Sequence, residues 1–106
     1  MSEVFALGQL QAKRSKERKS YLEFLRVPAM SAGLYVLPAG AGDPQSPHNQ
    51  DEIYYVVTGA AQMRLGSNER NVAKGDVIFV EANLEHRFFD IEEELVLLVI
   101  FAPAET

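Results

Sequence analysis

The residues best suited to chemistry lie close together in the stretch 46–59, SPHNQDEIYYVVTG. His48 precedes Glu52 by four residues, and an aromatic and β-branched run then leads to Gly59. This composition predicts a strand that ends in a turn. Because alternate side chains of a strand share a face, we expect His48 and Glu52 to point to the same side. An imidazole and a carboxylate that converge in this way predict part of a metal site.

Three more side chains belong to this predicted arrangement. Gln50 shares the strand face with His48 and could supply an oxygen ligand or hold a bound water. Gln45, in the loop before the strand, is a second candidate for that oxygen. Tyr54 lies on the same face, and its hydroxyl could orient a substrate or donate a proton. We therefore predict Tyr54 as a catalytic residue.

The composition limits the kind of protein and the kind of site. The chain has 106 residues, of which 47% are apolar, enough for one domain with a modest core. It has no cysteine, so oxygen and imidazole are the metal ligands that remain. No apolar run approaches the ~20 residues that span a bilayer, and the N-terminus lacks the apolar centre of a signal peptide. We expect a soluble, cytoplasmic protein without a membrane partner.

The charge is distributed unevenly along the chain. Residues 13–19 hold five cations against Glu17, a net charge of +4, so the rest of the chain sums to −9 within the total of −5. An acidic body argues against nucleic acid as a partner. The basic segment could bind an anion, but a solvated arm or a strand edge kept soluble by lysine explains so short a run better.

The remaining sequence predicts short strands between turns. Proline, glycine and polar clusters separate apolar or alternating runs, and we find no convincing long helix. Many short strands with frequent turns indicate an all-β sandwich or barrel. The predicted strands cover residues 21–27, 31–37, the stretch that ends at 59, 60–65, 69–73, 77–80, 86–90 and 95–102.

Two further expectations concern packing. The last predicted strand, residues 95–102, is LVLLVIFA, which is too apolar for a strand with one solvent-exposed face. It should be buried on both sides or covered by a second subunit, so we expect a homodimer. Large aromatic side chains should fill the interior of a small barrel, and we expect this of Tyr54, of Phe88 and of either Tyr35 or Phe79.

Two motifs then resemble those of the cupin superfamily. The first family motif contains a glycine, two histidines, a glutamate and a glycine, with five, one, three or four, and six residues between them. This chain has Gly40, Ser46, His48, Glu52 and Gly59 at those positions, with serine in place of the first histidine.

The second family motif contains glycine, proline, glycine, histidine and asparagine, with five, one, two and three residues between them. Gly75 and His86 match it, whereas Glu81, Asn83 and Asp90 stand at the other three positions. The resemblance covers residues 31–102.

The resemblance implies a jelly-roll barrel, or double-stranded β-helix, usually dimeric. It implies one domain over residues 1–106, with an N-terminal arm at 1–20, the barrel at 21–102 and a tail at 103–106. Family metals are held by two histidines and a glutamate of the first motif and a histidine of the second. His48, Glu52 and His86 are retained here, so a divalent transition metal such as iron, manganese, nickel or zinc is implied, with Ser46 a weak substitute for the missing ligand.

Several functions remain open. Two histidines and one carboxylate suit a non-haem oxygenase that acts on a small organic molecule inside the barrel. The alternative is a non-catalytic barrel that binds a small molecule with a degenerate or empty metal position. A third possibility is a metal-free isomerase or epimerase in which His48 or His86 is the base. Arg64 and Arg87 could anchor an anionic substrate, or could simply pair with surface carboxylates.

Overall fold

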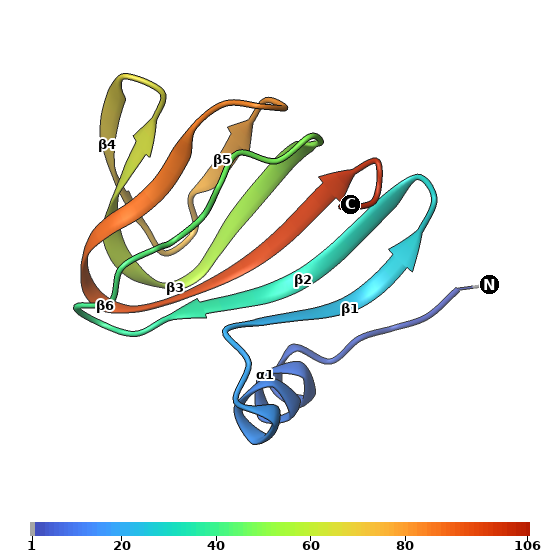
Figure 1. Ribbon diagram of the computed structural model, residues 1–106. Coiled ribbons are helices and arrows are strands. Elements are labelled where there is room, and N and C mark those ends of the chain that lie inside the picture. Colours follow the sequence, from blue (N-terminus) through green and yellow to red (C-terminus); the bar gives the residue numbers. More distant parts are fainter. Residues whose placement is uncertain (1) are drawn as a thin grey trace.

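The computed structural model describes residues 2–106, which form one helix and six strands (Figure 1). In chain order they are α1 (Leu7–Glu17), β1 (Tyr21–Val27), β2 (Met30–Leu37), β3 (Asp51–Leu65), β4 (Asn68–Ala73), β5 (Val77–Val80) and β6 (His86–Ala102).

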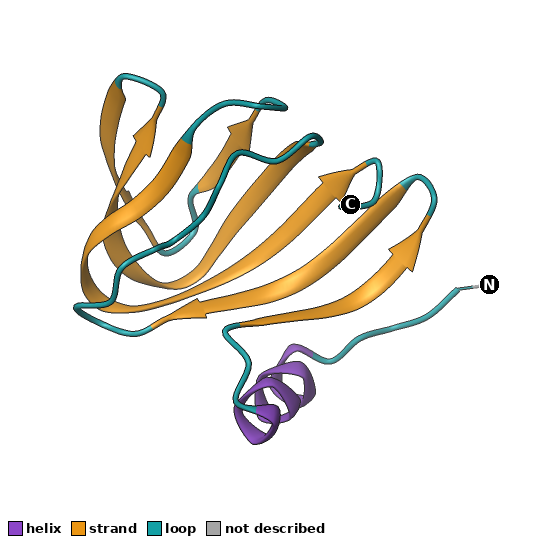
Figure 2. Cartoon of the chain, viewed as in Figure 1, coloured by secondary structure: helices purple, strands orange, loops and turns teal. Residues whose placement is uncertain are grey.

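All strand pairs are antiparallel, in the order β1-β2-β6-β3-β4, with β5 also paired to β3. The long strands β3 and β6 curve, so that the sheet folds back over itself (Figure 2). The predicted all-β, jelly-roll fold is confirmed. The two sides of the curved sheet enclose the interior in which His48, Glu52 and His86 meet.

Strand β3 differs from the prediction at both ends. It begins at Asp51, so His48 and Gln50 lie on the preceding loop and not on the strand, where alternation was expected to orient them. Pro47 lacks a backbone donor, which disfavours an earlier start. At the other end, β3 passes through Gly59 and continues to Leu65, with register shifts against β6 between Val56 and Gln62. A glycine at a bulge bends the strand here without ending it.

Strand β6 is also continuous, although two strands with a turn at residues 92–94 were predicted. The glutamates of that segment are exposed, but its backbone stays in the ladder, where Ala60 pairs with Glu93. Asp90 adopts a positive φ of 47°, and β6 bends there while the strand goes on. The residues at 95–102 are mostly buried on both faces, as predicted for that run.

The N-terminal segment contains a helix. Helix α1 takes in most of the basic residues at 13–19, which therefore lie on a helix and its C-terminal end and not on a strand edge. Leu10 packs against Leu34, Val36 and Val96, covering part of the outer face of the sheet. Within residues 2–106 no helix is long and apolar enough to cross a membrane. The cytoplasmic location and the boundaries at 20 and 102 stay predictions.

The core lies inside the curved sheet. Tyr54 and Phe88 are fully buried there, as predicted, and Tyr35 is partly buried against the same cluster. Phe79, the alternative to Tyr35 for an interior position, is 61% exposed. Its neighbours Ile78 and Val80 point inward, so strand alternation places Phe79 on the outer face.

Candidate metal centre

Three different segments bring the predicted ligands together inside the barrel. His48 comes from the loop before β3, Glu52 is the second residue of β3, and His86 is the first residue of β6. One possible ligand atom from each lies within 4.8 Å of the other two. The loop is tied to the second motif because the backbone N–H of Asn83 donates to the carbonyl oxygen of His48 at 2.6 Å. Asn83 has a φ of 68°, which explains why the family motif has glycine there.

Glu52 and His86 form the buried half of this centre. Their side chains are each 1% exposed, and Oε1 of Glu52 lies 3.2 Å from Nε2 of His86. The Nδ1 of His86 is 2.9 Å from the carbonyl oxygen of Leu84, so Nδ1 carries the proton that makes this hydrogen bond. This leaves the Nε2 lone pair of the neutral ring facing Glu52. Both carboxylate oxygens and this Nε2 have no hydrogen-bond partner.

The protonation of His86 reflects two opposing effects. Burial lowers the pKa of His86, whereas the carboxylate of Glu52 and the carbonyl of Leu84 raise it, and the net shift is upward from the ordinary value. His86 can therefore be protonated, but its protonation creates an ion pair with Glu52 in an interior with little access to water. Such a pair gains little net stability from its own attraction.

The unpartnered atoms fit a metal ion. Ligand atoms about 2.1 Å from one ion and at right angles to each other lie about 3.0 Å apart. The distance of 3.2 Å between Oε1 of Glu52 and Nε2 of His86 is close to that value. A carboxylate with two imidazole nitrogens is also a donor set that suits first-row transition metals.

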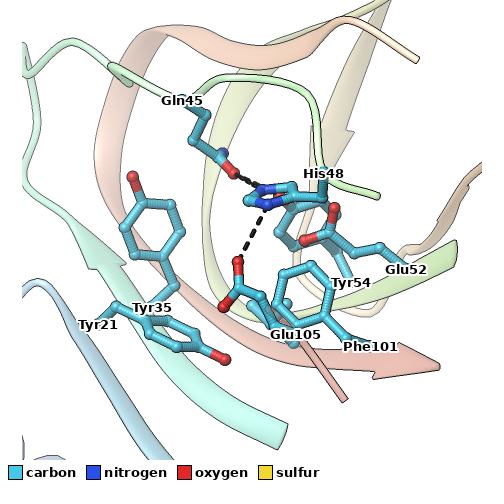
Figure 3. A pocket seen from close by; sticks show the side chains of 9 residues that line it. Tyr21, Tyr35, Gln45, His48, Glu52, Tyr54, Phe101 and Glu105 are labelled. Atoms are coloured by element: carbon cyan, nitrogen blue, oxygen red, sulfur yellow. Dashed lines mark hydrogen bonds and ion pairs between the residues drawn. The ribbon is translucent and has the colours of Figure 1, made fainter. Parts of the chain in front are cut away.

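His48 is held on both sides of its ring (Figure 3). Its Nδ1 lies 3.0 Å from a carboxylate oxygen of Glu105, and its Nε2 lies 3.0 Å from Oε1 of Gln45. Histidines that bind metal commonly donate their other ring N–H to a carboxylate, which fixes the tautomer. The contact with Glu105 has this form, and it leaves Nε2 of His48 free to act as a ligand.

Glu105 reaches the centre because the C-terminal tail is fastened to the β1–β2 hairpin. The backbone N–H of Glu105 donates to Oγ of Ser31 at 2.9 Å, and its carbonyl accepts from Arg26 at 2.6 Å. Burial raises the pKa of the Glu105 carboxyl, an effect that His48 partly opposes. The tail thus forms part of the site wall.

The other two predicted site residues, Gln50 and Tyr54, have different surroundings. Gln50 is buried, but its amide donates to Oγ1 of Thr106 at 2.9 Å and its Oε1 has no partner. Tyr54 lines the cavity, and its hydroxyl donates to Oε1 of Gln45 at 3.0 Å. Burial, with the nearby charge of Glu52, raises the pKa of Tyr54 well above its ordinary value. Tyr54 is therefore a hydrogen-bond donor and not a base near neutral pH.

A cavity of about 210 Å³ adjoins the three ligands. Its size lies below the range of about 300–1,000 Å³ typical of drug-sized ligands. Its walls combine tyrosines with apolar side chains, and neither lysine nor arginine is among the described residues that line it. The lining residues are Tyr21, Tyr35, Gln45, His48, Glu52, Tyr54, Val99, Phe101 and Glu105.

The two arginines considered as substrate anchors lie elsewhere. Arg64 pairs with Glu69 at 2.6 Å on neighbouring strands, and Arg87 lines a separate surface depression that includes Asp90. Sequence reasoning did not identify Glu105 or Tyr21 as site residues. Neither belongs to a local motif, and both enter through contacts between distant segments.

Comparisons with known proteins agree with this architecture. The family model described as a cupin domain matches residues 33–101. An uncharacterized protein of Streptomyces coelicolor is 46% identical over 103 residues, which cover 97% of this chain and 98% of that protein. The chain therefore belongs to the cupin family.

Solved structures extend the likeness to three dimensions. The crystal structure of TT1209 from Thermus thermophilus is 27% identical and superposes with a TM-score of 0.74, over 97% of this chain and 99% of that one. KdgF from Halomonas sp. is 24% identical with a TM-score of 0.71, over 78% of this chain and 76% of that one, and shares the fold.

Proposed function

We propose that this cupin holds a divalent transition metal at His48, Glu52 and His86 and uses it to act on a small organic molecule in the adjoining cavity. The observation that carries the proposal is the buried pair of Glu52 and His86, whose facing ligand atoms have no hydrogen-bond partner. A fold tolerates such unsatisfied buried groups at a cost of about 1–3 kcal/mol each, which function can explain. A bound metal would supply Lewis-acid polarisation and, if it is iron, a place for dioxygen.

The chain's own residues define what the cavity does to a bound molecule. Val99 and Phe101 form an apolar wall that excludes water from one side. Tyr54 keeps its proton and presents a fixed donor, so we propose that it orients the substrate or donates a proton to it. Iron would favour oxygenase chemistry, because two histidines and one carboxylate leave open coordination positions.

The charge of the cavity restricts the substrate. Glu52 and Glu105 bring two carboxylates to a cavity whose described lining has no lysine or arginine. An anionic substrate could therefore enter only by binding the metal directly. We propose a small molecule with a metal-binding oxygen group and an apolar part that meets Phe101.

Metal binding and open coordination positions can be tested without knowing the substrate. The metal-free protein would be titrated anaerobically with Fe²⁺, Mn²⁺, Ni²⁺ and Zn²⁺ in a calorimeter, and the ferrous protein would then be exposed to nitric oxide. We expect one ion per chain and, with iron, the electron paramagnetic resonance signal of a high-spin ferrous nitrosyl.

Glu52→Gln should abolish both the heat of metal binding and the nitrosyl signal. Glu69→Gln makes the same chemical change on the surface and should leave both unchanged. Metal binding without a nitrosyl signal would argue against the oxygenase.

A non-catalytic small-molecule binder is the second candidate. It is favoured by Ser46, which occupies the position of the missing family ligand and is exposed to solvent. A barrel that binds its ligand equally well with and without metal, and that shows no nitrosyl signal, would favour this alternative.

We also propose that the protein is a homodimer. Four exposed apolar side chains form an outer patch on β3 and β5, where Ile53 is registered with Phe79 and Tyr55 with Val77. Their exposed fractions range from 41% to 65%. The patch continues onto β6, the strand for which a covering subunit was expected. Light scattering coupled to size exclusion would test the proposal.

A further inference from the structure

The missing family ligand has a neighbour that reaches the centre in its place. Ser46 stands at the motif position but is exposed and does not line the cavity. Gln45, one residue earlier, points into the cavity from the same loop, and Figure 3 shows its side chain directed at His48. The glutamine side chain is long enough to bring an oxygen to the centre, whereas the serine hydroxyl is not directed there.

The orientation of the Gln45 amide is fixed by a buried aspartate. The amide nitrogen donates to Oδ2 of Asp43 at 2.7 Å, so the carbonyl oxygen must face the opposite way, toward the cavity. Asp43 is itself 8% exposed, and it accepts hydrogen bonds from the Tyr35 hydroxyl at 2.7 Å and the Phe88 backbone at 2.9 Å. Two donors besides the amide itself therefore hold the aspartate in place.

The contact between Gln45 and His48 places two acceptors face to face. With the proton of His48 on Nδ1, where Glu105 accepts it, Nε2 carries a lone pair, and it lies 3.0 Å from the carbonyl oxygen of Gln45. In this tautomer, a metal ion bound by both atoms would satisfy the two lone pairs. The separation equals the value of about 3.0 Å expected for adjacent ligands of one metal ion.

We propose that Oε1 of Gln45 is the fourth protein ligand of the metal, in place of the missing histidine, and that Asp43 is the residue that positions it. This inference rests on the proposed function, since it requires a metal at His48, Glu52 and His86. The same oxygen accepts the hydroxyl of Tyr54 at 3.0 Å. Tyr54 is thereby linked to the metal through Gln45, which couples the predicted proton donor to the ligand set.

Another arrangement, with no metal ligand at residue 45, also satisfies these contacts. A second proton on His48 would let its ring donate to Gln45 and Glu105 at once, and Gln45 would then serve only to hold the ring. The two arrangements differ in what happens when the amide is replaced. A ligand role makes the coordination number of the metal depend on residue 45, whereas a purely structural role changes only the affinity, through the position of His48.

Three glutamine-to-methionine variants separate these roles. The measurements are the Kd for Co²⁺ by calorimetry and the visible Co²⁺ spectrum, whose intensity rises as the coordination number falls. We expect Gln45→Met to weaken Co²⁺ binding at least about tenfold, with stronger absorption.

Gln62→Met, on the surface of β3, is the matched control and should change neither measurement. Gln50→Met tests the other glutamine predicted as a ligand, and its effect should be smaller than that of Gln45→Met. Thermal melting of each metal-free variant checks that the fold is intact.

The outcomes distinguish this inference from the proposed function. If the wild type binds Co²⁺ and Gln45→Met binds it equally well with an unchanged spectrum, the ligand assignment is wrong and the three-ligand centre stands. If Gln45→Met weakens binding but leaves the absorption intensity of the bound Co²⁺ unchanged, Gln45 only positions His48 and the assignment is again wrong. If the wild type binds no metal, the proposed function itself fails.

Discussion

Replacing Glu52 with glutamine should stabilise the metal-free protein while removing its response to metal. The carboxylate is 1% exposed, and neither of its oxygens has a partner. A glutamine amide in that position could donate to Nε2 of His86, which has a lone pair 3.2 Å from the present Oε1. Satisfying such buried groups is worth about 1–3 kcal/mol, which corresponds to a rise in Tm of about 4–12 °C at about 4 °C per kcal/mol.

The metal should reverse this order of stability. At a free metal concentration of about 1,000 times Kd, binding stabilises the wild type by about 4.1 kcal/mol, or about 16 °C. Glu52→Gln should show no comparable rise. Differential scanning calorimetry with chelator and with metal measures both effects, and Glu69→Gln is the surface control.

The pH of this experiment matters because of His86. Because the pKa of His86 is raised in the folded protein, its protonation contributes stability at low pH, and this contribution is lost as the pH rises through the folded-state pKa. The gain from Glu52→Gln should therefore be larger in weakly alkaline buffer and shrink as the pH falls. A metal-free variant that melts clearly below the wild type in the alkaline buffer would refute the view that Glu52 lacks a hydrogen-bond partner in the metal-free protein.

The other predictions concern the cavity wall, the tail and the outer patch. Tyr54→Phe should weaken binding of the cavity ligand or slow turnover, and unchanged values for both would remove Tyr54 from the mechanism. Absorbance at 295 nm during an alkaline titration should show Tyr21, Tyr35 and Tyr54 ionising above the usual pH of about 10, mainly because burial raises each pKa, and stability should fall as they ionise. Glu105→Gln should weaken metal binding by about tenfold through His48, and unchanged affinity would mean that the tail does not position the ring. Phe79→Lys should convert the dimer to a monomer by light scattering, whereas a monomeric wild type would contradict the proposed interface.

The motif spacing carried most of the information about the centre. Glycines with special backbone geometry recur at fixed distances from the ligands, and Gly59 and Gly75 have φ values of 103° and 93°. They fix where the strands bend, and so which residues meet inside the barrel. For His48 the predicted neighbour was right, but the reason was wrong, since a loop tied to Asn83 positions it and strand alternation does not.

The length of the strands could not be read from local composition. Gly59 and the glutamates at 92–94 have the composition of turns, yet β3 and β6 pass through both because the long antiparallel pairing between them continues. A glycine or a run of charged residues disfavours a strand only weakly. The ladder formed with a distant partner outweighs that preference.

Two features of the site, the position of Glu105 and the orientation of the Gln45 amide, could not be predicted from the sequence for a different reason. Glu105 lies 57 residues after His48, and its position depends on contacts with Ser31 and Arg26 of the first hairpin. Gln45 was one of two candidate glutamines, and only the bond to Asp43 shows which way its amide faces. Neither a contact between distant segments nor the orientation of an amide produces a periodic or compositional pattern in the sequence.

The central claim is that His48, Glu52 and His86 together hold a metal ion. The most direct test is the metal content, by mass spectrometry, of protein purified without chelator or metal-affinity resin, compared with a His48→Ala, His86→Ala double variant. We predict about one equivalent of a first-row transition metal in the wild type and none in the variant. A wild type that stays empty after metal is offered anaerobically, or a variant that retains as much metal as the wild type, would contradict the account.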